Sequence, residues 1–587
     1  MSMLILPLIF SGVLAFIAEF LLGSVGAVAG AGIWRPLNRL LLWDGKEMFK
    51  TGIWNKYLVR LTLLFYAIIM PWWVLGSLPI YLAWLYLPYL IVASVYWWNY
   101  TGKHRGKAVT VEPYTPEEKS FTFETTTGSL FIDNPRRGIF ISGGAGSGKS
   151  KSIIEPVIHQ AGQNDYTGIV YDFKFPTLAE EVAGSYANSK VSTYYVNFAD
   201  LSCSHRINPL APDLISDNTY AREAATTILI NIDFKAAQNR SFWIQSAEVL
   251  LTGAIWYLRN NYPEYCTLPH AVSLLLESDP KTLINTLQQD YEVKGIIASV
   301  AAGSESQNQL AGVFATIQNY MATLNSPALF WVLSGNEVPF DLNDPKKPSI
   351  LTVGNDPTLT ATLSPVISLI VATALKRMNQ SNRQQSVVIL DEAPTLFIPK
   401  FEDIPATGRS NFISVIYAVQ DIAQMEGRLG PSTSEMIISN LGSQFYGRTT
   451  NPKTAQRVTA LFGKHDVEYE SYGYSQSDGN SSINQSYSMQ LRDRLESQEV
   501  MRFRKGEFAG LIAEGNKTEF RRQFIQPPTK AQPIKPINAV SEEKVLDNFK
   551  QIKEQIRQLL TPSQKTALPP ANKPNANNIE QNWEDYG

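Results

Sequence analysis

A glycine-rich run between an apolar segment and a helix-like segment has the residue types needed to bind phosphate. Glycines let the backbone curl so that successive N–H groups converge on phosphate oxygens, and the helix that follows directs its positive end at them. In the pattern G-x-x-x-x-G-K-[ST], the lysine reaches the β- and γ-phosphates and the hydroxyl coordinates Mg²⁺. The run therefore predicts a nucleotide-binding loop that consists of Gly143, Gly144, Ala145, Gly146, Ser147, Gly148, Lys149 and Ser150.

An acidic pair stands far downstream, at the end of "SVVILDE" (386–392). The apolar residues before it predict a buried parallel strand. Asp391 can hold the Mg²⁺ shell with Ser150, and Glu392 can polarise the attacking water. The competing interpretation is a buried structural carboxylate at a strand end. Together with the loop, the pair predicts a site that binds ATP and Mg²⁺ and hydrolyses ATP, with Lys149 and Glu392 as catalytic residues.

Two further polar residues flank the next strand-like run, in "ATGRSNFISVIYAVQD" (406–421). Gln420 stands at the carboxyl end of that run, where we expect a sensor of the γ-phosphate. Arg409 precedes the run and has two interpretations. It is either a finger inserted into a neighbouring subunit's site, worth roughly 10³ to 10⁵ in rate where it operates, or an ordinary loop arginine.

The elements that must position these residues alternate along the body of the chain. Strand-like runs at 167–173, 349–355 and 412–420 are separated by helical runs, which predicts an α/β fold around a mostly parallel sheet. Upstream of the loop, "FTFETTTGSLFI" predicts a short hairpin. We expect the nucleotide-binding domain to comprise residues 120–211 and 336–530.

Residues 212–335 interrupt this alternation with helical patterns, which predicts an all-α insertion with its own core. Within it, Phe242 and Trp243 share helical spacing with Leu250 and Leu251, so we expect core positions for both aromatic residues rather than substrate contacts.

The C-terminal part of the chain is less regular. The segment 470–490 is rich in Ser, Asn, Gly and Tyr and fits either a flexible loop or a paired edge hairpin. An amphipathic helix is expected at 541–560. It lies in a C-terminal region, 531–587, whose Pro/Asn-rich end should be disordered.

The first hundred residues have the composition of a membrane region. Residues 3–34 and 61–100 carry a single charge, Glu19, and a spanning helix needs about 20 apolar residues, so we expect about three spans within 1–100. Basic residues follow the first and third spans. The positive-inside rule therefore places the amino terminus outside and every residue from the start of the linker 101–119 onward in the cytoplasm. A non-spanning amphipathic hairpin at 61–98 is the alternative.

Composition limits the function classes further. The 587-residue chain has a net charge of −2 and two cysteines. This charge balance argues against a broadly basic nucleic-acid-binding surface, so any contact with DNA must rest on a local patch, such as a basic track inside a pore. Two cysteines exclude a disulfide framework and favour a reducing compartment.

An ordered set of motifs behind the apolar segments resembles a known family. "GGAGSGKS", "VYDFKFP" (170–176), "SHRINPLAP" (204–212), "ILDEAPTL", "ATGRS" and "AVQD" look like motifs of the TraG/TraD-like coupling ATPases of conjugative type IV secretion. The resemblance covers about residues 1–525. It implies a homo-hexameric ring in the bacterial inner membrane. Each subunit would carry a RecA-like P-loop motor domain and a membrane-distal all-α domain.

The resemblance also implies partners and residue roles. The ring would recruit single-stranded DNA with its attached relaxase and pass it to the type IV secretion channel. Arg409 matches the trans-acting arginine of the family, and Gln420 matches its sensor glutamine. We interpret "DFK" (172–174) and "NPL" (208–210) as architectural signatures. Many relatives have two membrane spans, where three are expected here.

Two rival functions fit parts of the same pattern. An export receptor for protein effectors would use the same motor, and the sequence does not separate it from a DNA pump. A double-stranded DNA translocase of the chromosome-segregation type would share the P-loop. Against it, the sequence shows neither a long Pro/Gln linker before the motor nor a winged-helix-like module after it.

Overall fold

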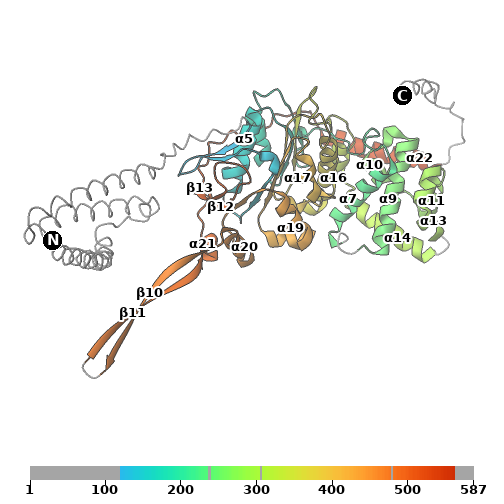
Figure 1. Cartoon of the computed structure of the whole chain (residues 1–587). Helices are drawn as coiled ribbons and strands as arrows, with labels where there is room; N and C mark the ends of the chain where they lie inside the picture. The colour runs from blue at the N-terminus through green and yellow to red at the C-terminus, as the bar shows by residue number, and fades with distance from the viewer. Residues whose placement is uncertain (1–118, 236–239, 304–306, 478–479, 562–587) are drawn as a thin grey trace, which may run out of the picture. The chain divides into compact units, whose positions relative to one another are not determined.

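The computed structural model describes residues 119–235, 240–303, 307–477 and 480–561 (Figure 1). The predicted membrane spans within 1–100 and the predicted disordered end of the chain lie outside the described residues, so both stay predictions. Within the described residues, one helix, α16 (Thr360–Met378), is long and apolar enough to cross a membrane. Because 67% of its most apolar window is buried inside the protein, α16 has the surroundings of a core helix.

A nine-stranded sheet forms the centre of the described residues, in the order β13-β12-β9-β3-β8-β7-β4-β6-β5. Neighbours from β9 to β5 run parallel, whereas β12 pairs antiparallel with both β9 and β13. The predicted α/β fold with a mostly parallel sheet is thereby confirmed. The strands are β3 (Ile139–Ser142), β4 (Thr167–Asp172), β5 (Ser192–Val196), β6 (Ser349–Gly354), β7 (Ser386–Leu390), β8 (Ile413–Val419), β9 (Ser443–Tyr446), β12 (Glu507–Leu511) and β13 (Glu519–Gln523).

The central strands are buried on both faces, as their nearly continuous apolar sequences require. Ile139 and Ile141 of β3 point into one core, and Phe140 between them points into the other. The first core contains α5 (Glu155–Gln163), α6 (Thr177–Ser185) and the antiparallel hairpin of β1 (Phe121–Phe123) and β2 (Leu130–Ile132), which confirms the hairpin prediction. The second core contains α16 and continues into the inserted helices.

The described residues between β5 and β6 contain helices and no strand (Figure 1). Several of these helices are preceded by a capping residue whose side chain accepts a hydrogen bond from an N–H of the first turn. Asp217 caps α7 and Thr267 caps α10 in this way, and such caps fix where a helix starts. The helices are α7 (Asn218–Ile232), α9 (Phe242–Asn261), α10 (Leu268–Glu277), α11 (Pro280–Leu287), α12 (Tyr291–Ile296), α13 (Ala298–Ala302), α14 (Gln307–Ala322) and α15 (Pro327–Leu333).

The prediction of core positions for Phe242 and Trp243 is wrong. Their exposed fractions are 52% and 43%, although Leu250 and Leu251 further along α9 are fully buried. The two aromatic residues form the first turn of α9, and the buried stretch of the helix begins only at Ser246. The Trp243 ring packs over Gly312 of α14, where an added Cβ atom would lie 2.7 Å from it.

The chain after β13 runs back across the molecule to α22 (Glu542–Leu560), the last helix of the described residues, which confirms the predicted amphipathic helix. On the way, the Ile537 N–H donates to the Ser202 carbonyl at 2.8 Å. Helix α22 then packs against the inserted helices: the rings of Phe549 and Phe330 lie 4.8 Å apart between centroids, and Arg557 pairs with Glu277 at 2.8 Å. The C-terminal helix therefore belongs to the core of the inserted helices.

Strands β10 (Lys464–Ser477) and β11 (Asn480–Asp493) form a separate antiparallel hairpin. Of the two structures predicted for segment 470–490, a flexible loop or a paired hairpin, the structure therefore shows the hairpin. Within the described residues it forms its own two-stranded sheet, apart from the main one (Figure 1). Short helices join the later strands: α17 (Ile404–Gly408), α18 (Ile422–Leu429), α19 (Pro431–Asn440), α20 (Pro452–Phe462) and α21 (Ser497–Met501).

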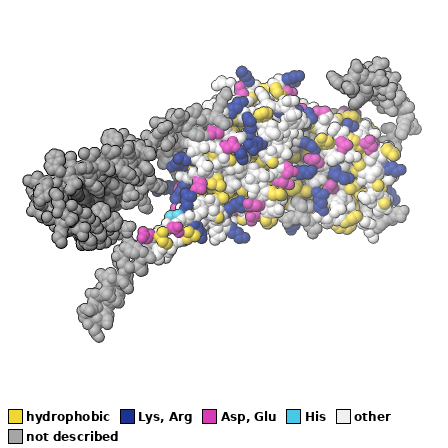
Figure 2. All heavy atoms as spheres, viewed as in Figure 1, with side chains coloured by type: hydrophobic (Ala, Val, Ile, Leu, Met, Phe, Trp, Pro, Cys, Tyr) yellow, Lys and Arg dark blue, Asp and Glu magenta, His cyan; other side chains and the backbone are white. Residues whose placement is uncertain are grey.

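Charged side chains of both signs share the surface. Figure 2 shows Lys and Arg side chains interspersed with Asp and Glu across one face of the described residues. Many are paired, as Arg457 is with Glu435 at 2.6 Å. This face agrees with the near-neutral net charge of the sequence.

Candidate nucleotide site

The glycine-rich loop connects the carboxyl end of β3 to a helix that starts as one π-helical turn, Ser150–Ile154, and continues as α5. Gly148 has a φ of +98°, which residues with a side chain rarely adopt, and a Cβ atom there would lie 2.9 Å from the Gly506 nitrogen. The Gly506 N–H also donates to the Ser147 carbonyl at 2.8 Å. The loop is thus held from outside by the turn that precedes β12.

The structure brings Lys149 and Glu392 together. The Lys149 Nζ lies 3.6 Å from the Glu392 Oε2, and both side chains are buried. Burial lowers the pKa of Lys149, while the negative charges of Glu392 and Asp391 oppose that shift. Burial likewise raises the pKa of Glu392 and of Asp391 against the attraction of the Lys149 ammonium. The predicted lysine and acidic pair therefore share one electrostatic environment.

Two polar atoms of the loop lack a hydrogen-bond partner in the part of the chain that the structure describes. They are the Ser147 Oγ and the Lys149 Nζ, and both are buried. A buried polar group without a partner is costly in a folded protein. A phosphate oxygen against the Lys149 ammonium would satisfy that donor, so the residues present fit a nucleotide phosphate.

The residues after the acidic pair fix the shape of its turn. Glu392 has a φ of +53°, a left-handed conformation that costs a residue with a side chain about 1–3 kcal/mol. The Thr395 hydroxyl donates to the Glu392 carbonyl at 2.7 Å and contacts the Tyr171 hydroxyl at 2.8 Å. The Ser364 hydroxyl of α16 donates to the Thr395 carbonyl at 3.0 Å. Buried hydrogen bonds from β4 and α16 thus hold Glu392 in place.

Gln420 lies directly after β8 and reaches the site through its backbone. Its N–H donates to the Glu392 Oε1 at 3.3 Å. The prediction placed this residue at the end of a strand near the γ-phosphate, and the structure puts it beside the acidic pair.

Arg409 is not brought to Lys149 of the same chain. It precedes β8, so it lies at the amino edge of the sheet, whereas the nucleotide loop lies at the carboxyl edge. Its side chain is half exposed, and its Nη2 lies 4.0 Å from the Glu514 Oε1. Glu514 also pairs with Arg137.

Sequence reasoning missed Arg448, which follows β9. Its carbonyl accepts the Gly144 N–H at 2.8 Å, and its Nη2 would lie 3.7 Å from a Cβ atom on Gly146. It also missed Gly506, which holds the loop from the β12 side. No local pattern marks either residue, because "YGRTT" and "RKGEF" read as ordinary turns.

The two signature motifs take structural positions. Asp172 accepts hydrogen bonds from the Leu178 N–H at 2.8 Å and the Ala179 N–H at 3.0 Å, and so caps the start of α6. Asn208 donates to the Cys266 carbonyl at 3.0 Å and accepts from the Leu210 N–H, which ties the segment after β5 to the inserted helices. Both sets of contacts are architectural.

A phosphate loop at the carboxyl edge of a parallel sheet, with an acidic pair two strands away, places the protein in the P-loop class of nucleotide-binding proteins. A family model described as "Type IV secretory system Conjugative DNA transfer" matches residues 101–523, and the chain belongs to this family. The resemblance to coupling proteins is thereby confirmed. A search of curated proteins gave no match.

Solved structures of the bacterial conjugative coupling protein TrwB share the fold. The unbound form of TrwBdeltaN70 has a TM-score of 0.55 at 14% identity and covers 72% of this chain and 92% of that one. TrwB with the ATP analogue ADPNP has a TM-score of 0.54 at 14% identity, and the match covers 68% of this chain and 88% of the TrwB chain. TrwB with ADP and Mg²⁺ has a TM-score of 0.51 at 14% identity, with the same coverage, 68% and 88%.

Proposed function

We propose that this protein is an ATPase that drives conjugative DNA transfer. The observation that carries the proposal is the buried Lys149, whose ammonium faces Glu392 and lacks a hydrogen-bond partner among the described residues. Membership of the conjugative DNA transfer family supports the process that the hydrolysis would serve. The TrwB complexes with ADPNP and with ADP and Mg²⁺ support ATP and Mg²⁺ as the ligands of the corresponding loop here.

Each site residue has a defined task in this proposal. The loop N–H groups and Lys149 bind the phosphates, and Ser150 and Asp391 are the expected Mg²⁺ ligands. The ion, when bound, neutralises charge on the phosphates. Glu392 orients and polarises the attacking water, and Gln420 holds the Glu392 carboxylate through its backbone N–H.

The assembly and substrate follow from the family resemblance. The proposed protein is a homo-hexamer in the bacterial inner membrane, with its motor domain in the cytoplasm. It recruits single-stranded DNA with its relaxase and passes both to components of the type IV secretion channel. The position of Arg409 at the opposite edge of the sheet from its own loop supports action on a neighbouring subunit's nucleotide.

The test measures ATP turnover by the full-length chain, purified in detergent, with and without single-stranded DNA across a salt series. We expect turnover that single-stranded DNA stimulates and that Lys149→Ala abolishes. No turnover by the wild-type protein would contradict the ATPase assignment.

Two other outcomes would select the rival functions. Turnover of a hexameric protein that DNA leaves unchanged at every salt concentration would favour a receptor for protein effectors. Stimulation by double-stranded DNA alone would favour a translocase of the chromosome-segregation type.

A further inference from the structure

The carboxyl end of α7 is bonded to the segment that follows the acidic pair. Asn231, in the last turn of α7, has an exposed fraction of 2%. Its amide nitrogen donates to the Phe397 carbonyl at 2.7 Å, and its amide oxygen accepts the Phe397 N–H at 2.8 Å. The same oxygen accepts the Ser368 hydroxyl of α16 at 2.9 Å. One side chain of the inserted domain thus satisfies both backbone groups of Phe397.

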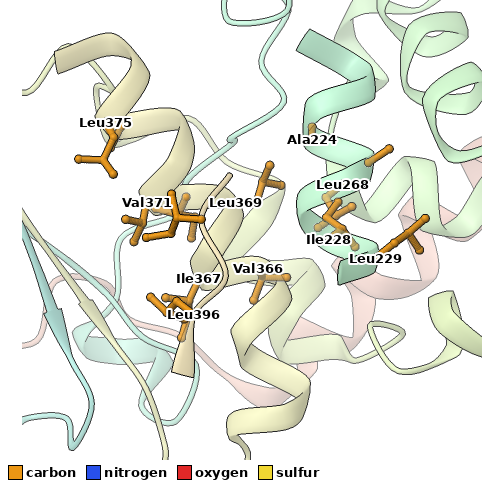
Figure 3. Packing of buried hydrophobic residues seen from close by; sticks show 14 of the residues in the cluster. Ala224, Ile228, Leu229, Leu268, Val366, Ile367, Leu369, Val371, Leu375 and Leu396 are labelled. Carbon is orange, nitrogen blue, oxygen red and sulfur yellow. The ribbon is translucent and has the colours of Figure 1, made fainter. Parts of the chain in front are cut away.

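Apolar packing surrounds these bonds. Figure 3 shows Ile228 and Leu229 of α7 on one side and Val366, Ile367 and Leu369 of α16 on the other, with Leu396 beside Ile367. Since Leu396 immediately precedes Phe397, the segment after the acidic pair is part of the same buried layer.

A second contact joins the same parts of the chain. Phe234 lies two residues after the end of α7, and the Arg428 guanidinium of α18 stands 5.0 Å from the centroid of its ring. The Arg428 Nη1 also donates to the Pro394 carbonyl at 3.4 Å. Helix α18 starts directly after Gln420 and Asp421, so Arg428 joins the end of α7 and the segment after the acidic pair to the helix that follows β8.

The path from Asn231 to the proposed catalytic carboxylate is short. Phe397 lies two residues after Thr395, whose hydroxyl donates to the Glu392 carbonyl at 2.7 Å. The left-handed conformation of Glu392 persists only where its surroundings hold it. A shift of the 394–397 segment would therefore be passed to the direction of the Glu392 side chain.

We propose that Asn231 is a positioning residue for ATP hydrolysis, which ties the turn of Glu392 to the inserted helical domain and makes the geometry of that carboxylate depend on the position of α7. The proposal rests on the ATPase function proposed above. Asn231 makes no contact with the nucleotide loop in the described structure, so its effect should fall on turnover and not on nucleotide binding.

The chemistry at this position calls for an amide. Phe397 presents one donor and one acceptor to the same side chain, and a primary amide, which only Asn and Gln carry, meets them with two neighbouring atoms of one planar neutral group. Alanine would remove the partners of both backbone groups of Phe397. Aspartate would keep the shape but set a carboxylate oxygen against the Phe397 carbonyl, where the amide nitrogen donates now.

The experiment compares Asn231→Ala and Asn231→Asp with wild type as full-length protein in detergent, without DNA. Steady-state ATPase kinetics give kcat and KM, a fluorescent ATP analogue gives nucleotide affinity, and thermal unfolding checks that the variants fold. We expect kcat to fall roughly tenfold in both variants, with KM and affinity within about twofold of wild type, because a lost buried hydrogen bond acts on the Glu392 turn alone.

Lys376→Ala is the matched control. It breaks the contact of Lys376 with Glu223, 2.6 Å long, across the same α7–α16 packing but far along the helices from Phe397. It should keep the wild-type kcat.

Four outcomes would overturn the inference. They are an unchanged kcat in a folded Asn231→Ala protein, an equal loss of nucleotide affinity, a kcat retained by Asn231→Asp, and a kcat loss of the same size in Lys376→Ala. If Asn231→Ala does not fold, Arg428→Ala takes its place in the test. We expect its kcat to be about threefold lower than that of wild type, and an unchanged kcat would contradict the inference. Absence of turnover in the wild type would overturn the proposed function itself, whereas normal wild-type turnover with an unaffected Asn231→Ala overturns only this inference.

Discussion

The guanidinium of Arg448 stands over the nucleotide loop, and its carbonyl holds the Gly144 N–H. An exposed cation in this place would add to the binding of a nucleotide phosphate in the ground state. We expect Arg448→Ala to raise the KM for ATP about three- to tenfold and to leave kcat within about twofold. Arg222→Ala, which removes an exposed arginine from α7, is the control. Equal KM values for Arg448→Ala and wild type, in steady-state assays, would show that Arg448 does not reach the nucleotide.

At this scale, the sequence predicted the residues whose chemistry demands one residue type at one spacing. Lys149, Ser150, Asp391 and Glu392 follow from such patterns, and the structure brings Lys149 and the acidic pair together. Arg448 could not be predicted, because its contact with the loop arises from the parallel pairing of β9 with β3 over a long sequence separation. Nothing in the residues around it encodes that pairing.

Among the elements, α6 depends on a buried carboxyl whose ionisation is unfavourable. Burial raises the pKa of Asp172 to about 7, against the backbone N–H groups that it accepts from at the start of the helix. The folded-state pKa is therefore above that of the unfolded chain. The neutral Asp172 carboxyl therefore contributes to the free energy of unfolding at low pH, and this contribution is lost as the pH rises towards about 7.

Replacing Asp172 by Asn tests this. We expect wild type to lose stability relative to Asp172→Asn as the pH rises from about 4 to about 7, by about 1.4 kcal/mol per pH unit. Above about pH 8 the difference should be constant. Chemical denaturation of both proteins at several pH values measures it, and a difference that grows in favour of wild type with rising pH would contradict the prediction.

The elements also show where pattern reading stops. Helical spacing correctly identified α9 and the burial of Leu250 and Leu251, yet Phe242 and Trp243 are exposed. Periodicity tells which side of a helix faces a neighbour, but it does not tell how far along the helix that neighbour extends. The strands were more predictable, since a strand covered on both faces must be apolar throughout.

The whole molecule carries a prediction about neighbouring subunits. Arg409→Ala keeps Glu392, and Glu392→Gln keeps Arg409. If Arg409 acts in trans, a ring that mixes the two variants contains interfaces with an intact residue from each subunit. We expect partial recovery of ATP turnover on mixing. As a control, mixing Glu392→Gln with Lys149→Ala should recover nothing, because both defects lie in the same site. No recovery in the first mixture would favour a loop role for Arg409.

The order of the strands in the sheet has a consequence for synthesis. The first three parallel strands to emerge from the ribosome, β3, β4 and β5, do not pair with one another; later strands lie between them. The inserted helices, whose contacts are mostly local, leave the ribosome before β6, the shared neighbour of β4 and β5. Local contacts form faster than distant pairings. The helices α9, α10 and α14 should thus pack on one another first, whereas the inserted helices that α16 and α22 cover, and the three unpaired strands, stay exposed to aggregation until those later segments are made.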